Sequence, residues 1–282
     1  MKRKVVVIGI DGGDWNVLGT LIDQKELKTF KHLLINGTKS TLTSTMPPVT
    51  APAWASFVTG KLPKKHGVYD FITPESTLSR FRPVTSLDIK GFTFYEVLSS
   101  IGLKSVLINL PLSYPPRIEG IFLPSITTPS GGIFYPPQLR EEMPELKKYR
   151  VTPNNKLLVK GKVTEYINDI RNVEAIRFEC ARRLFQKQEW DLFFILFSGT
   201  DWAQHVIYNK LINLEDCPEV NEYINLLRDI DRYIRWFLTN APSNTNFFIL
   251  SDHGFKVYSG IFFINEWLRR RGFLQVTLVP SK

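Results

Sequence analysis

The chain has 282 residues, of which 43% are hydrophobic and 22% are charged, a balance that excludes a disordered tail and a fibrous repeat. Its net charge is +9, but the basic residues are scattered and accompany no zinc-finger or RNA-recognition signature, so we find no nucleic-acid motif. No apolar run approaches the ~20 residues that a membrane span needs, and the apolar stretch near the N-terminus leads into an acidic-glycine turn without a cleavage site. We therefore expect a cytoplasmic protein without a membrane segment.

Short apolar segments alternate with amphipathic ones along the chain. In chain order, strands are predicted at 4–10, 104–109, 191–197 and 246–250, and helices at 51–58, 164–188, 220–238 and 265–271. Each strand is apolar on both faces, as strands between two helical layers are. The two long helices each carry one apolar stripe. The pattern predicts a single α/β domain over residues 1–282, a three-layer αβα sandwich with a mostly parallel central sheet.

Residues 111–153 interrupt this alternation. The segment is rich in proline, glycine and serine, and its apolar residues follow neither a strand period nor a helix period. It is too long for an ordinary connection between two elements. We expect a loop-rich insertion over one edge of the sheet.

Acidic residues and histidines follow three of the predicted strands. The first strand ends in Asp11, the third is followed by Asp201 and His205, and the fourth ends in Asp252 and His253. Because the carboxyl ends of parallel strands form the ligand crevice of an open α/β sheet, these five residues should converge there.

The spacing of these residues suits a metal site. Asp201 and His205 are four residues apart, which places both on one face of a helix. Asp252 and His253 are adjacent, so the backbone must turn after them, as Gly254 allows. Mixed aspartate and histidine ligands suit zinc, with manganese or iron as alternatives. Each of the three patterns alone also fits a surface pair or a capping residue. All three follow strands that are predicted to be buried, and a chance occurrence of three such patterns in one chain is a poor explanation.

A hydroxyl group stands at the start of the predicted helix 51–58. Pro52 suits a first helical turn, Gly60 ends the helix, and Thr50 is predicted as its N-cap. At this position a hydroxyl faces free backbone N–H groups and the positive end of the helix dipole, a setting that favours an alkoxide and an incoming phosphoryl group. Threonine is also an ordinary N-cap and needs no other role.

Several segments together resemble a known family. They are GIDGGDWNVL, PPVTAPAWASFVTGKLPKKHG, TFYEVLSSIGLKSVLINLPLSYPP, FSGTDWAQH, and LSDHGF followed by INEWLRRRGFL, in this order over residues 4 to about 275. The chain resembles the type I phosphodiesterase/nucleotide pyrophosphatase branch of the alkaline phosphatase superfamily. The resemblance implies an alkaline phosphatase-like fold and a site with two divalent metal ions. One zinc would be held by Asp11, Thr50, Asp252 and His253, and the second by Asp201 and His205 with a later histidine.

The function implied by this resemblance is hydrolysis of a small phosphate ester, with Thr50 as the nucleophile of a phospho-threonine intermediate. A phosphomutase of the cofactor-independent phosphoglycerate type and a sulfatase are alternatives on the same scaffold, although both prefer a different nucleophile from threonine. A non-catalytic relative that binds a metal or an anion is the alternative from another class. The oligomeric state is left open.

Two positions depart from the family pattern. Nucleotide pyrophosphatases usually have an asparagine three residues after the nucleophile, where this chain has Ala53, and no histidine follows His253. The first departure puts nucleotide specificity in doubt. From the second, and from a β-prone run at 273–279 with no covering element, we expect a chain lacking its C-terminal part, with one tight and one weak metal site.

Overall fold

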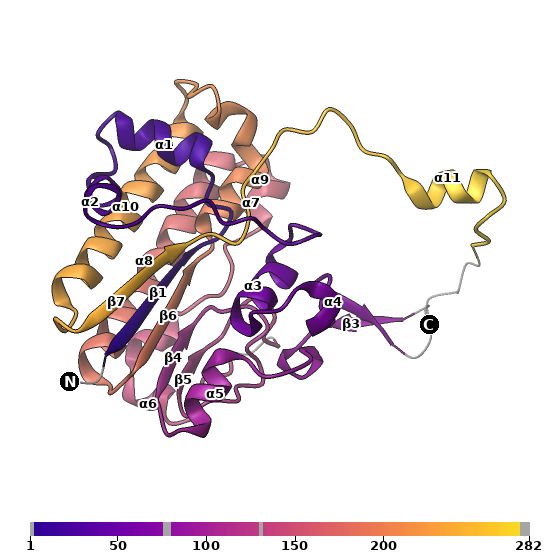
Figure 1. Cartoon of the computed structure of the whole chain (residues 1–282). Helices are drawn as coiled ribbons and strands as arrows, with labels where there is room; N and C mark the ends of the chain where they lie inside the picture. Colours follow the sequence, from indigo (N-terminus) through magenta and orange to yellow (C-terminus); the bar gives the residue numbers. More distant parts are fainter. Residues whose placement is uncertain (1–2, 76–79, 130–131, 277–282) are drawn as a thin grey trace.

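A computed structural model of the chain describes residues 3–75, 80–129 and 132–276 (Figure 1). Five parallel strands form its central sheet in the order β5-β4-β6-β1-β7. The strands are β1 Lys4–Ile10, β4 Ser105–Ile108, β5 Gly120–Leu123, β6 Leu192–Phe197 and β7 Thr245–Leu250. All four predicted strands are therefore present, and β5 is a fifth that the sequence pattern did not reveal.

Alternate residues of each central strand point to opposite faces of the sheet. Both faces are apolar because both sets of residues are apolar. In β1, Val6 and Ile8 belong to the core on one face, whereas Val7 belongs to the core on the other. Strand β6 is buried along its whole length. This arrangement explains why these strands read as unbroken apolar runs in the sequence.

Helices cover both faces, which confirms the predicted αβα architecture with its parallel sheet. One face carries the larger layer, and the opposite face carries a smaller one in which Trp54 packs edge-on against Phe194 of β6. The larger layer consists of α1 Trp15–Asp23, α2 Lys28–Asn36, α8 Val163–Lys187, α9 Gly199–Leu211 and α10 Pro218–Asn240, and the smaller of α3 Thr50–Thr59 and α5 Phe94–Ser100. No helix in the described ranges is long and apolar enough to cross a bilayer.

The segment 111–153 contains three short regular elements among its loops. It contributes β5, which pairs in parallel with β4 at one edge of the sheet. It also contains the short helix α6 Leu139–Glu142 and the 3-10 helix η2 Pro144–Lys148, and it places Phe122 and Leu139 in the core. The remaining elements are short: α4 Pro63–His66, the hairpin of β2 Ile72–Pro74 and β3 Phe81–Pro83, the 3-10 helix η1 Ser86–Asp88, and α7 Lys156–Val159.

The other edge of the sheet is β7, whose outer side pairs with no strand of the described residues (Figure 1). After β7 the chain leaves the sheet and reaches α11 Ile264–Arg270, which stands away from the body and has no buried residue. Residues 273–276 form no strand, and the rest of the β-prone run predicted at 273–279 lies outside the described residues.

Candidate active site

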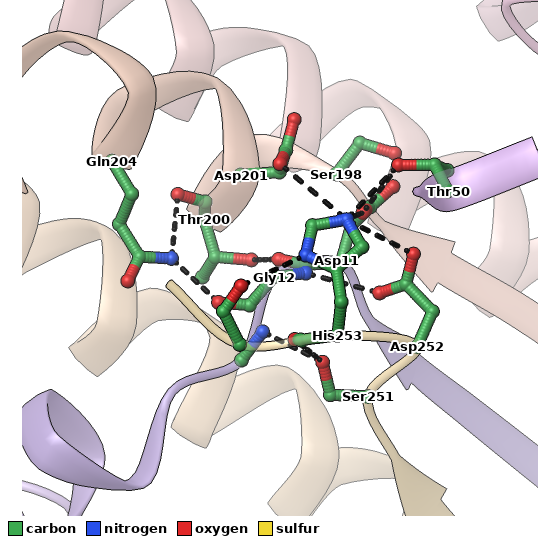
Figure 2. Close-up of polar contacts among 12 residues, drawn as sticks. Asp11, Gly12, Thr50, Ser198, Thr200, Asp201, Gln204, Ser251, Asp252 and His253 are labelled. Carbon is green, nitrogen blue, oxygen red and sulfur yellow. Dashed lines mark hydrogen bonds and ion pairs between the residues drawn. The ribbon is translucent and has the colours of Figure 1, made fainter. Parts of the chain in front are cut away.

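The three acidic strand ends meet at the carboxyl edge of the sheet, as the sequence predicts (Figure 2). Strands β6, β1 and β7 are neighbours in that order, so the residues that follow them are brought side by side. Asp11 follows β1, and Asp252 and His253 follow β7. Asp201 lies in the first turn of α9, directly after β6.

The imidazole of His253 lies at the centre of this group. Its Nε2 is 3.6 Å from Asp11 Oδ1, 3.3 Å from Asp252 Oδ2 and 3.9 Å from Asp201 Oδ1. The hydroxyl of Thr50 completes the group, because its Oγ1 is 3.1 Å from the same nitrogen and 3.4 Å from Asp11 Oδ1. One imidazole nitrogen, three carboxylates and one hydroxyl therefore share a single small volume.

The tautomer of His253 follows from its second ring nitrogen. Nδ1 is 3.1 Å from the carbonyl oxygen of Gly254, which can only accept a hydrogen bond. Nδ1 therefore donates this bond, and Nε2 is the ring nitrogen that faces the carboxylates and Thr50 and could ligate a metal. A backbone carbonyl that orients an imidazole in this way is typical of a histidine that ligates a metal.

Thr50 is the first helical residue of α3 and not its N-cap, which corrects the sequence prediction. The N-cap is Val49, whose carbonyl accepts a hydrogen bond from the backbone N–H of Ala53 at 3.1 Å. An N-cap side chain needs a free N–H two or three residues later. Pro52 has no N–H and that of Ala53 is already used, so the Thr50 hydroxyl is left to face the strand ends.

Burial raises the pKa of two of the carboxylates, and charge repulsion adds to this effect at Asp11. Burial raises the pKa of Asp11 well above its ordinary value, and the neighbouring charges of Asp252 and Asp201 raise it further. Burial also raises the pKa of Asp252, although the nearby His253 acts in the opposite direction. A divalent cation would relieve both effects by neutralising the charge.

Two orphaned oxygen atoms fit such a cation. Asp201 Oδ1 and Asp252 Oδ2 are buried and have no hydrogen bond of acceptable geometry to any described residue. Ligating atoms of Asp11, Asp252 and His253 lie within 4.8 Å of one another, as close as the ligands of one ion. Two carboxylates and one imidazole are a donor set that suits zinc and also manganese or iron.

The second predicted pair lies at the mouth of the site. His205 Nε2 is 3.3 Å from Asp201 Oδ1, and the side chain of His205 is 67% exposed. The interaction with Asp201 raises the pKa of His205. His205 and His253 both line a cleft of about 300 Å³, and the ring of Phe255 lies 5.0 Å from that of His205 and 5.8 Å from that of His253.

The other two histidines of the chain do not reach this site. His66 is fully buried, and its Nδ1 accepts a hydrogen bond from the backbone N–H of Val68 at 3.1 Å. Its Nε2 must then carry the proton, and this N–H donates to Ser56 Oγ at 2.8 Å. His66 therefore has a structural role. His32 pairs with Asn36 on the exposed side of α2.

Several supporting contacts were not predicted from the sequence. The N–H of Gly12 donates to Asp252 Oδ1 at 3.1 Å, and Gln204 Nε2 donates to the carbonyl of Gly12 at 2.7 Å (Figure 2). The Thr200 hydroxyl donates to the carbonyl of Asp11. These bonds tie the turn after β1 to α9 and to the loop after β7. The only sequence signal for them is the glycine pair at 12–13, since Gly12 has a φ of +63° that favours glycine.

Solved structures share the fold at low sequence identity. Phosphonoacetate hydrolase from Sinorhizobium meliloti 1021, in complex with phosphonoformate, is 15% identical and has a TM-score of 0.64, covering 95% of this chain and 62% of the other. Murine ectonucleotide pyrophosphatase/phosphodiesterase 5 is 15% identical and has a TM-score of 0.55, covering 89% of this chain and 57% of the other. The chain thus spans about 60% of the length of these proteins. Their likeness supports an alkaline phosphatase-like fold.

Family membership comes from the sequence as a whole. Among curated proteins, none matches the sequence. A family model described as type I phosphodiesterase/nucleotide pyrophosphatase matches residues 5–279, which include every residue of the site described above. The match covers nearly the whole chain. The chain belongs to the type I phosphodiesterase/nucleotide pyrophosphatase family.

Proposed function

We propose that the chain is a metal-dependent hydrolase of small phosphate esters, of the phosphodiesterase/nucleotide pyrophosphatase type, with Thr50 as its nucleophile. The observation that carries this proposal is the position of the Thr50 hydroxyl. Its Oγ1 lies 3.1 Å from Nε2 of His253 and 3.4 Å from a carboxylate oxygen of Asp11. An ordinary helix-start threonine on the surface has no such neighbours.

The residues divide into two candidate metal sites. The first consists of Asp11, Asp252 and His253 with the Thr50 hydroxyl, and the second of Asp201 and His205. Three protein ligands and one open position are the usual set of a catalytic zinc, which only the first site provides from its own aspartates and histidine. When bound, the two cations lower the pKa of a ligating hydroxyl or water and neutralise charge on the phosphoryl group. We propose zinc, with manganese or iron as alternatives.

The protein groups account for the remaining steps. Thr50 Oγ bonds to phosphorus as the bond from phosphorus to the leaving oxygen breaks; the hydroxyl proton passes to the Asp11 carboxylate oxygen 3.4 Å away, and the leaving oxygen takes a proton from water. A water molecule then attacks phosphorus, the bond from phosphorus to Thr50 Oγ breaks, and Oγ takes its proton back from Asp11 as the phosphate product leaves. Thr50 is the first residue of the ten-residue helix α3, so the positive end of the helix dipole faces the anionic group. The cleft of about 300 Å³ beside His205 leaves room for the leaving group.

A substrate panel tests the reaction class. The metal-stripped protein is reconstituted with Zn²⁺ or Mn²⁺ and offered bis-p-nitrophenyl phosphate, p-nitrophenyl phosphate, p-nitrophenyl sulfate and phosphonoacetate. We expect turnover of the phosphate esters that depends on added metal. Stoichiometric metal binding without turnover of any compound would favour a non-catalytic binding protein, and preferential sulfate hydrolysis would favour the sulfatase alternative.

Substitution of Thr50 tests the nucleophile. Thr50→Ala should reduce turnover by at least about 10³-fold, because it removes the oxygen that would form the intermediate. Thr50→Ser should retain partial activity and should still form a phosphorylated enzyme detectable by mass spectrometry. Thr59→Ala is the matched control, since Thr59 ends the same helix and its hydroxyl contacts backbone groups alone: it donates to the carbonyl of Ala55 and accepts from the N–H of Lys61. Turnover by Thr50→Ala at the rate of the control would reject the assignment.

A further inference from the structure

An ion pair between two fully buried side chains lies within helix α8. Glu174 and Arg177 both have 0% side-chain exposure, and Arg177 Nη1 donates to Glu174 Oε2. Buried ion pairs contribute little to stability, because the loss of hydration offsets the attraction between the charges. The contacts of the second carboxylate oxygen of Glu174 indicate another role for this pair.

Glu174 Oε1 caps the helix that carries the second candidate metal site. It accepts hydrogen bonds from the backbone N–H of Ser198 at 2.9 Å and from that of Gly199 at 2.7 Å. These two groups open α9, and the side chain of Ser198 makes no capping bond of its own. The first N–H groups of a helix have no partner within it, so a buried helix start needs an acceptor from elsewhere. Glu174 is that acceptor.

The start of α9 packs closely against α8 at Gly199. A Cβ atom on Gly199 would lie 2.7 Å from Cγ2 of Ile170 and 3.1 Å from Cγ of Glu174. Arg177 holds the carboxylate from the other side, and its Nη2 donates to the carbonyl of Val151 at 3.1 Å. The orientation of the Glu174 carboxylate is thus set by contacts on both of its oxygens.

The position of Asp201 depends on this junction. It is the third residue of α9, two residues after Gly199, and His205 follows one turn later on the same face. A helix start that is free to shift or fray would move the Asp201 carboxylate away from the strand ends. Groups that orient a metal ligand commonly contribute about 10- to 100-fold to metal affinity.

We propose that Glu174 is a positioning residue for the second metal site: by capping α9 it holds Asp201 and His205 in register with the site at the strand ends. This role rests on the proposed function, because it needs Asp201 and His205 to bind a cation. The capping depends on the acceptor oxygen of Glu174 and not on its negative charge. Its effect can therefore be measured separately from that of the ion pair with Arg177.

Two double variants of similar volume separate the acceptor from the charge. Glu174→Gln with Arg177→Met removes both charges but keeps an oxygen that can accept from Ser198 and Gly199. Glu174→Met with Arg177→Met removes the acceptor as well. The Arg177 change is common to both, so its effects on the neighbouring loop cancel in the comparison. Leu184→Ala is a control for general loss of stability, since Leu184 is buried further along the same helix.

Metal affinity is measured by calorimetric titration of each metal-stripped protein with Zn²⁺ alone, and His205→Ala identifies the second site. We expect the Met/Met variant to lose at least about 10-fold in affinity at the second site, with the first site unchanged. The Gln/Met variant and Leu184→Ala should stay within about 3-fold of the wild type at both sites. Wild-type affinity in the Met/Met variant, or equal losses in both double variants, would overturn the proposal.

Hydrogen exchange of the metal-free proteins gives a second readout that does not depend on the proposed function. In the Met/Met variant the backbone N–H groups of Ser198 and Gly199 should exchange at least about 10-fold faster than in the Gln/Met variant, while the last turn of α9 is unchanged. Unaltered exchange would refute the capping role. If the wild type binds one zinc only but the exchange differs as expected, the capping is upheld and the metal-binding part of the proposal is overturned.

Discussion

Replacing Asp11 by asparagine should stabilise the metal-free protein, although it removes a proposed metal ligand. Ligating oxygens of Asp11 and Asp252 lie within 4.8 Å of each other. Two unit charges at that distance repel by about 3 kcal/mol at an effective dielectric constant near 20. Asparagine keeps the shape and removes one charge, so the gain should approach that value. For a domain of this size it corresponds to a rise in Tm of about 5 °C.

The effect should depend on pH in a defined direction. The pKa of Asp11 is raised in the folded protein, so the folded state holds this proton more tightly than the unfolded chain does. The stability of the metal-free wild type therefore falls as the pH rises from about 4 through the raised pKa. Asp11→Asn does not titrate there, so the difference in Tm between variant and wild type should be absent near pH 4 and largest at about pH 8.

Zinc should reverse the order of stability. At a free concentration 1,000 times its Kd, a ligand stabilises the folded state by about 4.1 kcal/mol per site, which exceeds the lead of about 3 kcal/mol that the metal-free variant has. The wild type should gain this amount, whereas the variant should gain little because it has lost a charged ligand. Differential scanning calorimetry of both proteins, at about pH 4 and pH 8, with Zn²⁺ or with EDTA, measures the Tm under each of these conditions.

Asp231→Asn is the matched control. Asp231 is buried to the same degree, but its carboxylate accepts bonds from the backbone N–H groups of Thr29 and Phe30 at 2.9–3.0 Å and so caps α2. The same substitution there should lower the Tm with and without zinc. A metal-free Asp11→Asn protein that is less stable than the wild type at about pH 8 would refute the repulsion argument. An equal gain from zinc in both proteins would refute the assignment of Asp11 as a ligand.

Two further predictions concern the ligands and the turn after β1. Titration calorimetry of the wild type should resolve two unequal zinc affinities. His253→Ala should abolish the tighter binding and His205→Ala the weaker, and two equal affinities would contradict the assignment of His253 and His205 to different sites. Gly12→Ala should destabilise the protein by well over ~1 kcal/mol, because the φ of Gly12 is +63° and its new Cβ would lie 2.5 Å from the Phe255 ring. Gly60→Ala has the same φ of +63° but open space around the Cβ, so denaturant unfolding should show a cost of only about 1 kcal/mol; equal costs at the two positions would rule out the contact with Phe255 as the cause.

The strand ends were predictable because their signal is local. Each of β1, β6 and β7 is an apolar run with an aspartate within four residues of its end, and a parallel sheet brings such ends together whatever the details of packing. The strand β5 gave no such signal. It has only four residues, begins at Gly120 with a φ of +135°, and becomes a strand by pairing with β4. Pairing with a strand distant in the sequence decides whether such a short segment becomes a strand, so the residue pattern within the segment cannot reveal it.

The start of α3 and the cap of α9 show what local patterns miss. Thr50 fits the composition of an N-cap, but a proline two residues later removes one of the donors that the cap would need, and the helix begins one residue earlier. Glu174 is a charged residue on a buried helix face, and in the sequence it forms an ordinary i,i+3 pair with Arg177. Its bonds to Ser198 and Gly199 join residues 24 and 25 positions apart. Such a contact exists only once two helices have packed.

Within the part of the chain that the structure describes, no strand pairs with the outer side of β7, and this has a consequence for handling the protein. A strand at the edge of a sheet offers a row of backbone donors and acceptors to any other extended chain. In β7, Phe248 is also 56% exposed and adds apolar surface to that row. Natural edge strands are often protected by a lysine at such a position. Phe248→Lys should therefore give preparations that remain monodisperse at higher concentration than the wild type, without touching the strand ends where the site lies.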